Sequence, residues 1–354
     1  MKISKKDALM WFRFFAELPE DEPLMPHQQE LAWAVISQIE AAVDARHKEL
    51  MAQIPDLHTL GGRTYFVDPA KFSKGCTSCL TGTGLSAIRR TNKCNIRCPF
   101  CYNYGELDCQ ETIGEGLWEI GGTYFRVEDI DLLLSTSNRP TGVSYVYLEP
   151  FMEIELYPDI IRKFRAAGIH QHMYTNGTLC TEENLRALGE AGLDELRFNL
   201  GATSCADNVI QSIATAKKYI PTVAIETPMT PDFYEHFQQK KDVILATGLD
   251  FINCAELHLN PNNLPNYIGT PMYMTRRGYV SPIWSREITF RLMRQCAVEH
   301  WGIVVHDCSN HTKFARDLNL RAKEGGWFGQ SSYGSEFDRI PFAYFLQVLE
   351  DESF

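Results

Sequence analysis

The sequence lacks any long hydrophobic run. Every apolar stretch falls short of the ~20 residues that a membrane-spanning helix needs. Near the start of the chain, Arg13 and Glu17 break up the apolar patch at 8–15, so the hydrophobic core of a signal peptide is missing. We therefore expect no membrane span and no secretory leader, and we expect the protein to work in the cytoplasm.

Basic residues are scarce as well. Lys and Arg together number 34 against 45 Asp and Glu, and the formal net charge is −11. Such an acidic chain repels the phosphate backbone, so the composition disfavours nucleic acid as a partner.

A flexible linker is a third absence, because no repeat, low-complexity tract or Pro/Gly/Ser-rich segment divides the 354 residues. We expect a helical cap and hairpin at 1–74, a central domain at 75–265 and a C-terminal extension at 266–354 that closes one side of it. The cap follows from apolar residues at helical spacing before residue 55, and the hairpin from Gly61-Gly62 between strand-like runs.

The central region alternates strand-like and helix-like runs. The strand-like runs are 85–91, 143–149, 170–176, 195–200, 222–227 and 251–259. The helix-like runs are 127–136, 157–167, 182–191, 206–219 and 232–247. Six β-α units in series predict an α/β fold with a parallel sheet, either open or curled into a partial barrel.

Several of these strands have one polar face, whereas a parallel strand buried on both faces is nearly all apolar. In 251–259, Cys254, Glu256 and His258 alternate with apolar residues and share one face. The same alternation places Glu149 with two tyrosines in 143–149. We expect these polar faces to line an interior that holds a polar ligand, and Glu226 to project into it.

Cysteine is abundant, with 11 residues, which in a reducing compartment indicates metal more often than disulfides. Cys94, Cys98 and Cys101 follow the spacing C-x3-C-x2-C. A zinc site closed by four protein ligands lacks one partner here. Three thiolates around a [4Fe–4S] cluster leave one iron open to a small molecule. A rival is a zinc-ribbon interaction module, whose ligands would be Cys76, Cys79, Cys98 and Cys101.

The C-x3-C-x2-C spacing, with Phe100 just before the last cysteine, resembles the cluster motif of radical S-adenosylmethionine (radical SAM) enzymes. The segments KGCTSCLTGTG, HMYTNG, EAGLDELRFNL and VVHDCSNHTKF narrow the resemblance to a group described as similar to pyruvate formate-lyase activating enzymes. The resemblance implies a partial (β/α)6 barrel, a [4Fe–4S] cluster, S-adenosylmethionine and an external electron donor of the flavodoxin or ferredoxin type. It leaves the substrate open among peptides, proteins and small molecules.

The resemblance also assigns roles. Glu149 in Tyr147-Leu-Glu-Pro lies where the family carries a Gly-Gly-Glu-Pro-like segment and would receive the methionine ammonium. Asn176, at the end of one strand, would lie near the ribose or carboxylate, and Asn199, at the end of the next, would bond the ribose hydroxyls. The remaining residues expected at the cosubstrate or substrate are Phe100, Tyr102, Glu226 and His258. The interior position expected of Cys254 and Glu256, and not the resemblance, indicates that Cys254 would donate a hydrogen atom and that Glu256 would grip the cosubstrate or substrate or move a proton.

A second group of cysteines contains Cys76 and Cys79, spaced C-x2-C, and the distant Cys308. These three thiols are expected to hold an auxiliary iron–sulfur cluster or a zinc ion. Their fourth position is either open or filled by Cys109, His306 or His311.

Overall fold

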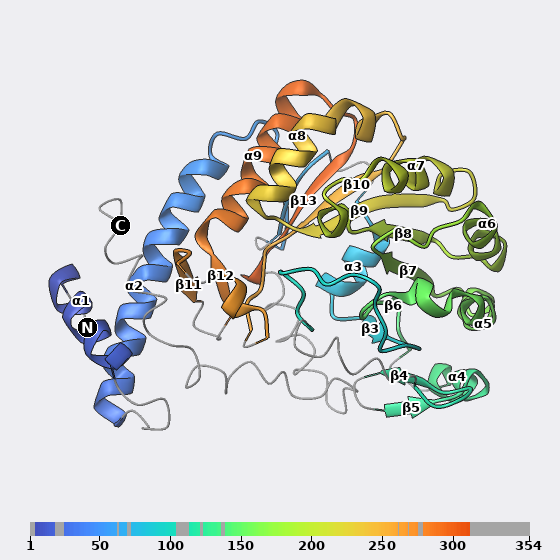
Figure 1. Ribbon diagram of the computed structural model, residues 1–354, viewed down its shortest axis with the longest axis horizontal. Coiled ribbons are helices and arrows are strands. Elements are labelled where there is room, and N and C mark those ends of the chain that lie inside the picture. Colours follow the sequence, from blue (N-terminus) through green and yellow to red (C-terminus); the bar gives the residue numbers. More distant parts are fainter. Residues whose placement is uncertain are drawn as a thin grey trace.

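A curved, nine-stranded sheet organises the computed structural model (Figure 1). The structure describes residues 4–17, 25–61, 64–68, 72–103, 113–120, 123–135, 139–260, 262–267, 269–274 and 279–311. In spatial order the strands are β1 (His58–Leu60), β2 (Thr64–Val67), β13 (Val304–Cys308), β10 (Phe251–Ala255), β9 (Thr222–Pro228), β8 (Glu195–Phe198), β7 (His170–Thr175), β6 (Gly142–Tyr145) and β3 (Gly84–Ile88).

The six strands from β10 to β3 are parallel and correspond to the six predicted from the sequence. β13 continues the parallel order beside β10, and β2 then pairs with β13 in the antiparallel sense. The α/β class and the mostly parallel sheet are therefore confirmed. The predicted cap contributes β1 and β2 to this sheet and the predicted C-terminal extension contributes β13, so all three predicted segments share it.

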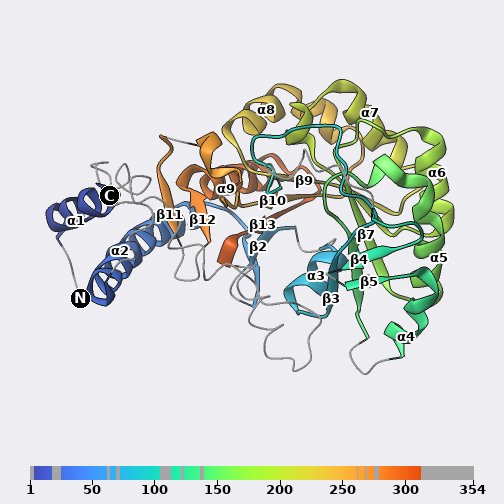
Figure 2. The same cartoon turned by 60° about the horizontal axis from the view of Figure 1, so that its bottom comes forward.

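Helices cover the convex face of the sheet (Figures 1 and 2). They are α4 (Ile130–Leu134), α5 (Tyr157–Ala166), α6 (Glu182–Ala191), α7 (Asp207–Ala216), α8 (Pro231–Leu245) and α9 (Ile283–Glu299). Their apolar sides and the outward residues of the strands form the largest core cluster. Local signals set the helix ends: Thr181 caps α6 by accepting from the Asn184 amide, and Gly192 ends it at φ 100°.

A short helix, α3 (Lys74–Leu80), lies against the concave face, where it contacts β3, β6 and β7 (Figure 2). Glycines allow this close approach. A Cβ built on Gly75 would lie 2.8 Å from both Arg197 and His172, and one on Gly142 would lie 2.8 Å from the Ser78 hydroxyl. Because no side chain larger than hydrogen fits there, α3 can pack inside the curve of the sheet.

The remaining elements flank this core. They are α1 (Lys5–Glu17), α2 (Pro26–Met51), the hairpin β4 (Trp118–Ile120) and β5 (Thr123–Phe125), the pair β11 (Met272–Met274) and β12 (Val280–Pro282), and the 3-10 turns η3 (Val127–Asp129), η4 (Pro150–Leu156), η5 (Leu200–Thr203) and η6 (Leu264–Tyr267). α2 packs on α9 and β11. Residues 312–354 of the predicted C-terminal extension lie outside the described residues.

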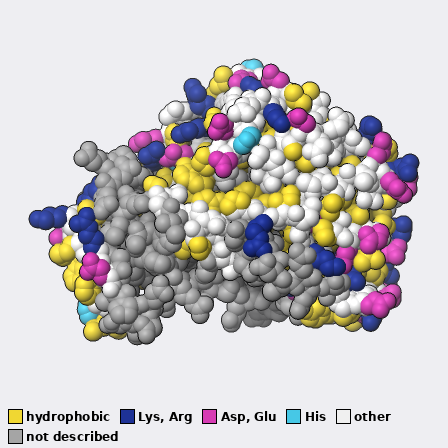
Figure 3. Space-filling model, viewed as in Figure 1, with side chains coloured by type: hydrophobic (Ala, Val, Ile, Leu, Met, Phe, Trp, Pro, Cys, Tyr) yellow, Lys and Arg dark blue, Asp and Glu magenta, His cyan; other side chains and the backbone are white. Residues whose placement is uncertain are grey.

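The described surface carries charged side chains of both signs. In the view of Figure 3, Lys and Arg side chains are interspersed with Asp and Glu around the helical rim. Among the described helices, none combines the length and the apolar character that crossing a bilayer requires.

Candidate functional site

The concave face of the sheet and α3 enclose a cavity of about 320 Å³. Its polar lining comes from one face of successive strands: Ser144, His172, Tyr174, Arg197, Glu226, Asn253, His306 and Cys308, with Cys76 and Cys79 from α3. Polar strand faces therefore do line an interior, as predicted. The inward placement predicted for Glu226 is confirmed too.

Two strands turn the opposite face inward from the one we predicted. Tyr145 points to the helices, where its hydroxyl donates to Gln171 at 2.7 Å, while Ser144 and Val146 line the cavity. On β10, Asn253 lines the cavity, whereas Cys254 is fully buried in the core between the sheet and the helices. The structure thus contradicts the interior position predicted for Cys254, because the cavity lies on the other side of its strand.

Glu256 likewise lies away from the cavity. One of its carboxylate oxygens accepts from the Tyr273 hydroxyl on β11, and the other accepts from the Asn310 amide at 2.6 Å. These bonds hold the ends of β10 and β13 against β11, so Glu256 serves the packing of this corner. His258, predicted at the cosubstrate, packs its ring against Tyr102 and Tyr279 with centroid distances of 5.4 and 4.9 Å.

The loop after β3 carries Cys94, Cys98 and Cys101. The Cys101 backbone amide donates to the Cys98 carbonyl at 2.9 Å, which closes a tight turn between these two cysteines. Burial, and next the neighbouring thiols of Cys101 and Cys94, raise the pKa of Cys98 to about 12. The three sulfurs therefore share one partly buried neighbourhood, as ligands of a single cluster must.

Asparagine side chains from 260–266 hold the backbone of this loop. The Asn260 amide group donates to the Tyr102 carbonyl at 2.8 Å, Asn263 donates to Phe100 at 3.2 Å, and Asn266 donates to Pro99 at 2.8 Å. Three carbonyls around Cys101 are thus fixed from a segment about 160 residues away in sequence. This role was not predicted from the sequence, although the run Asn-Pro-Asn-Asn at 260–263 is a visible signal of clustered donors.

A further bond ties the cysteine loop to the end of β7. The Asn176 side-chain amide donates to Asn95, next to Cys94, at 2.8 Å, and Asn95 in turn donates to the Thr178 hydroxyl at 2.8 Å. Asn199, at the end of β8, accepts from the Ala202 amide and the Thr227 hydroxyl. The structure thus brings Asn176 to the cysteine loop, and it places Asn199 at the same edge of the sheet.

Glu149 joins the ends of two strands. Its carboxylate accepts from the backbone amide of Phe151 at 3.0 Å, the Thr175 hydroxyl at 2.8 Å and the backbone amide of Asn176 at 2.6 Å. It is 1% exposed. Burial raises the pKa of Glu149 to about 7, although the three hydrogen bonds oppose the shift. Glu149 therefore positions Asn176 directly. A cation bound beside it would lower its pKa and favour the charged carboxylate.

This shift predicts a pH dependence of stability. Between the ordinary pKa of 4.5 and about 7, the folded protein keeps a proton on Glu149 that the unfolded chain has lost. The corresponding stability is fully present below the lower value and is lost as the pH rises through the upper one. We expect the free energy of unfolding of the cluster-free wild type to fall by roughly 3 kcal/mol between these limits relative to that of Glu149→Gln. Urea denaturation across this pH range measures the difference.

Thr175→Val is the matched variant for this experiment. It removes one hydrogen bond to the carboxylate and should move the transition to higher pH. If the free energy of unfolding changes with pH in the same way in wild type and in Glu149→Gln, the pKa of Glu149 is not raised in the folded protein.

The two residues before Glu149 adopt backbone conformations that favour glycine. Tyr147 has φ 118° and Leu148 has φ 52°. The family that the sequence resembles carries glycines here, so the backbone keeps a glycine-like path while the side chains differ. Each such residue costs on the order of 1–2 kcal/mol. The Arg89 guanidinium lies 4.2 Å from the centre of the Tyr147 ring and helps to hold it.

Arg197 is the charge centre of the interior. It is 2% exposed and donates to Glu195 at 2.5 Å, Glu226 at 2.5 Å and the Tyr174 hydroxyl at 3.1 Å. Its other terminal nitrogen donates to Ser73 at 3.1 Å and to the Cys76 sulfur at 3.5 Å. Burial would raise the pKa of Glu195, yet the Arg197 charge and a hydrogen bond from His170 hold it below its usual value. No pattern in the sequence assigned Arg197 a role.

The four cysteines of the zinc-ribbon alternative do not form a metal site in the structure. In the described part of the chain, which includes all four of its cysteines, no three Cys, His, Asp or Glu side chains are grouped to hold a single metal ion. Cys76 lies in the interior cavity, while Cys98 packs with the core near α2 and β11. A [4Fe–4S] cluster, by contrast, bonds each thiolate to a different iron, so its ligands stand further apart.

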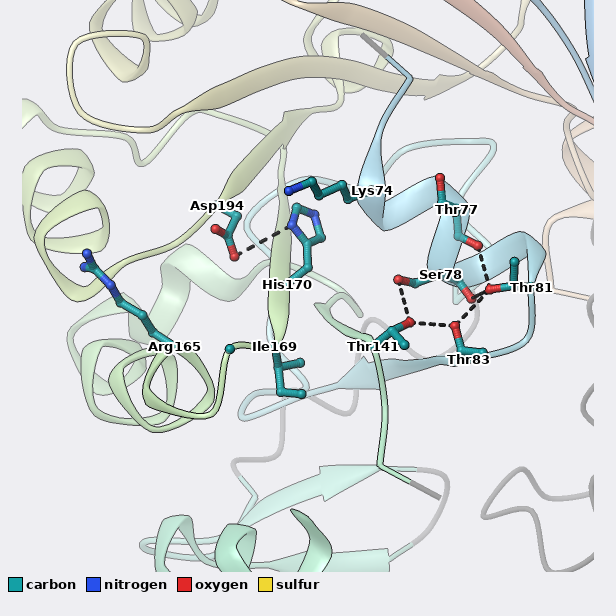
Figure 4. A pocket seen from close by; sticks show the side chains of 11 residues that line it. Lys74, Thr77, Ser78, Thr81, Thr83, Thr141, Arg165, Ile169, His170 and Asp194 are labelled. Carbon is teal, nitrogen blue, oxygen red and sulfur yellow. Dashed lines mark hydrogen bonds and ion pairs between the residues drawn. The ribbon is translucent and has the colours of Figure 1, made fainter. Parts of the chain in front are cut away.

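A second pocket of about 570 Å³ opens where the parallel strands begin (Figure 4). Hydroxyl groups of Ser78, Thr81, Thr83 and Thr141 form a hydrogen-bonded chain along one side. His170 faces Asp194 at 3.7 Å on the other. α3 separates this pocket from the interior cavity, since its residues line both.

Comparisons with known proteins agree with this geometry. Residues 88–240 match the model of the Radical SAM superfamily. The chain is 23% identical over 191 residues to the tungsten-containing aldehyde ferredoxin oxidoreductase cofactor-modifying protein of Pyrococcus furiosus, covering 47% of this chain and 49% of the relative. It is 26% identical over 206 residues to a putative glycyl-radical enzyme activating enzyme of Methanocaldococcus jannaschii, covering 54% and 52%. The chain thus spans about half the length of these curated relatives.

Among solved structures, SuiB of Streptococcus suis bound to S-adenosylmethionine matches with a TM-score of 0.40 and 14% identity, over 51% of this chain and 42% of SuiB. The matched 88–240 includes the three cysteines and the strand ends that surround them. Members of this superfamily are enzymes that use a [4Fe–4S] cluster and S-adenosylmethionine. Over its central region the chain is therefore similar to proteins of the radical SAM superfamily.

Proposed function

We propose that Cys94, Cys98 and Cys101 hold a [4Fe–4S] cluster whose open iron binds S-adenosylmethionine. The observation that supports this most strongly is the fixed loop: three neighbouring thiols, with Asn176 bonded to the Asn95 side chain beside Cys94 and Asn263 bonded to the Phe100 carbonyl beside Cys101. When bound and reduced, the cluster and S-adenosylmethionine supply a 5′-deoxyadenosyl radical that abstracts hydrogen from a substrate.

The chain's own residues orient this pair. Glu149 offers a buried carboxylate to the methionine ammonium, and it fixes the Asn176 amide beside the cysteine loop. Asn199, Tyr102, Phe100 and His258 are proposed to contact the cosubstrate from the same edge. Glu226, partly exposed in the cavity, is proposed to face the substrate.

We propose a peptide or protein substrate, with a small molecule as the second candidate. One relative is named as activating a glycyl-radical enzyme, which favours a polypeptide. An external flavodoxin or ferredoxin is the proposed electron donor.

The test is anaerobic purification followed by incubation with S-adenosylmethionine and dithionite. We expect a brown protein with bound iron and sulfide that releases 5′-deoxyadenosine, because cleavage of the sulfonium needs the reduced cluster. Omitting dithionite is the control and should give none. A colourless protein with one tightly bound zinc ion and no iron would refute the proposal.

A further inference from the structure

Cys76, Cys79 and Cys308 line the same interior cavity, apart from the loop that carries Cys94, Cys98 and Cys101. Cys76 and Cys79 come from α3, and Cys308 ends β13 on the other side of the cavity, more than two hundred residues later. Sequence spacing connects only the first two thiols. Only the insertion of α3 into the curve of the sheet brings the third to them.

His306, two residues before Cys308 on the same face of β13, adds a nitrogen to this group. It is 2% exposed, and its Nε2 lies 2.8 Å from the Thr64 hydroxyl. That hydroxyl donates its only proton to the Asp307 carbonyl at 2.9 Å, so it must accept from Nε2. The proton of the neutral ring therefore sits on Nε2, and Nδ1 carries a bare lone pair.

The Nδ1 atom of His306 is buried and makes no hydrogen bond within the described residues. A buried acceptor without a partner is costly, and such atoms mark places where a ligand or metal belongs. The second ring nitrogen is fixed by a hydrogen bond to Thr64, which is how metal-binding histidines are commonly oriented. His306 is thus arranged as a ligand through Nδ1.

We propose that Cys76, Cys79, Cys308 and His306 hold a second iron–sulfur cluster inside the barrel. Of the other residues considered for the fourth position, His311 is turned away, since its Nε2 lies 3.3 Å from Asp44 on α2. Asp307 points to the opposite face of β13, where it pairs with Arg286 at 2.9 Å. Cys109 lies outside the described residues.

A cluster fits these four residues better than a zinc ion does. Zinc needs all its ligands about 2.0–2.3 Å from one point, and no three such side chains in the described residues are grouped that closely. The cavity of about 320 Å³ has room for a cube whose corners reach separate ligands.

Arg197 also contacts the site. It donates to the Cys76 sulfur at 3.5 Å, which favours the thiolate form that a cluster ligand needs. A [4Fe–4S]²⁺ core with three thiolates and a neutral imidazole carries one net negative charge, which Arg197 stabilises. Hydrogen bonds to ligand sulfurs are a usual means of tuning such clusters.

Four protein ligands leave no open iron, so this cluster would transfer electrons and would not bind substrate. A histidine ligand in place of cysteine also raises the reduction potential of an iron–sulfur centre. The second cluster should therefore accept electrons more readily than an all-cysteine cluster would.

Iron counts and spectroscopy of the anaerobic protein test the assignment. We expect about eight irons per chain in wild type and about four after Cys76→Ala/Cys79→Ala/Cys308→Ala. About four should also remain after Cys94→Ala/Cys98→Ala/Cys101→Ala, with the second cluster's signal retained. Cys205→Ala, which alters a buried thiol in the outer core, is the matched control and should keep about eight.

A pulsed electron paramagnetic resonance experiment on protein labelled with ¹⁵N-histidine identifies the fourth ligand. The reduced cluster should show strong coupling to one histidine nitrogen in wild type. His306→Cys should abolish this coupling while keeping the iron count, and it should lower the potential. Four irons in wild type, or an unchanged count in the Cys76/Cys79/Cys308 variant, would overturn the proposal. Absence of the nitrogen coupling would remove His306 from it.

These outcomes are independent of the proposed radical chemistry. A protein without 5′-deoxyadenosine release but with the Cys76/Cys79/Cys308-dependent cluster would refute only the proposed function. A protein that cleaves S-adenosylmethionine with four irons would refute only the second cluster.

Discussion

Alanine at any one of Cys94, Cys98 or Cys101 is expected to reduce 5′-deoxyadenosine release by at least about 100-fold. Loss of an outer hydrogen-bonding partner already costs about 10–100-fold in comparable sites, and a direct ligand matters more. The loss should be similar for all three positions, because each thiolate holds a different iron of the same cluster. Product release and iron content per chain are the measurements.

Comparison among the three variants also separates the two metal hypotheses. A zinc ribbon would use Cys98 and Cys101 but leave Cys94 free, so Cys94→Ala would then retain metal and fold. Cys205→Ala is again the control for loss of a buried thiol. Full activity in Cys94→Ala would exclude the three-thiolate cluster.

Replacing Arg197 by methionine is expected to cause the largest loss of stability. The change leaves Glu195, which is 1% exposed, without its cationic partner. Breaking a buried ion pair from one side typically costs about 3–5 kcal/mol. For a chain of this size the loss corresponds to a fall of roughly 5 °C in the thermal midpoint. Thermal unfolding followed by circular dichroism on cluster-free protein measures it.

The double variant Arg197→Met/Glu195→Gln is the control. Most of the loss in the single variant comes from the buried, unpaired carboxylate of Glu195. Because the double variant removes this charge, it should recover a substantial part of the lost stability. A single variant that melts with the wild type would show that water reaches Glu195 and that the pair is not buried in solution.

Local sequence patterns were sufficient for several features. The spacing of Cys94, Cys98 and Cys101 indicated three thiolates at one site, because residues so close in sequence stay close in any fold. The six parallel strands and the helices between them followed from hydrophobic runs that end at glycines and capping threonines. These signals act within a few residues, so they survive without knowledge of the tertiary structure.

The inward direction of each strand was not determined by these patterns. Alternation tells which residues share a face, but not which face meets the helices. On β10 both faces are buried, and the alternation did not show which one meets the cavity. We predicted that the face with Cys254 lies inside, whereas the structure places Asn253 there and Cys254 in the core. On β7 and β8 the residues that line the cavity, His172, Tyr174 and Arg197, are polar.

By itself the sequence determined the fold class, the cysteine loop and the family that it resembles. The tertiary structure decided which distant groups meet: the asparagines of 260–266 at the cysteine loop, Arg197 at Glu195 and Cys76, and His306 with Cys308 opposite α3. Each of these contacts joins segments that are far apart in sequence or on different strands. Such contacts depend on the register and curvature of the whole sheet, which no local pattern contains.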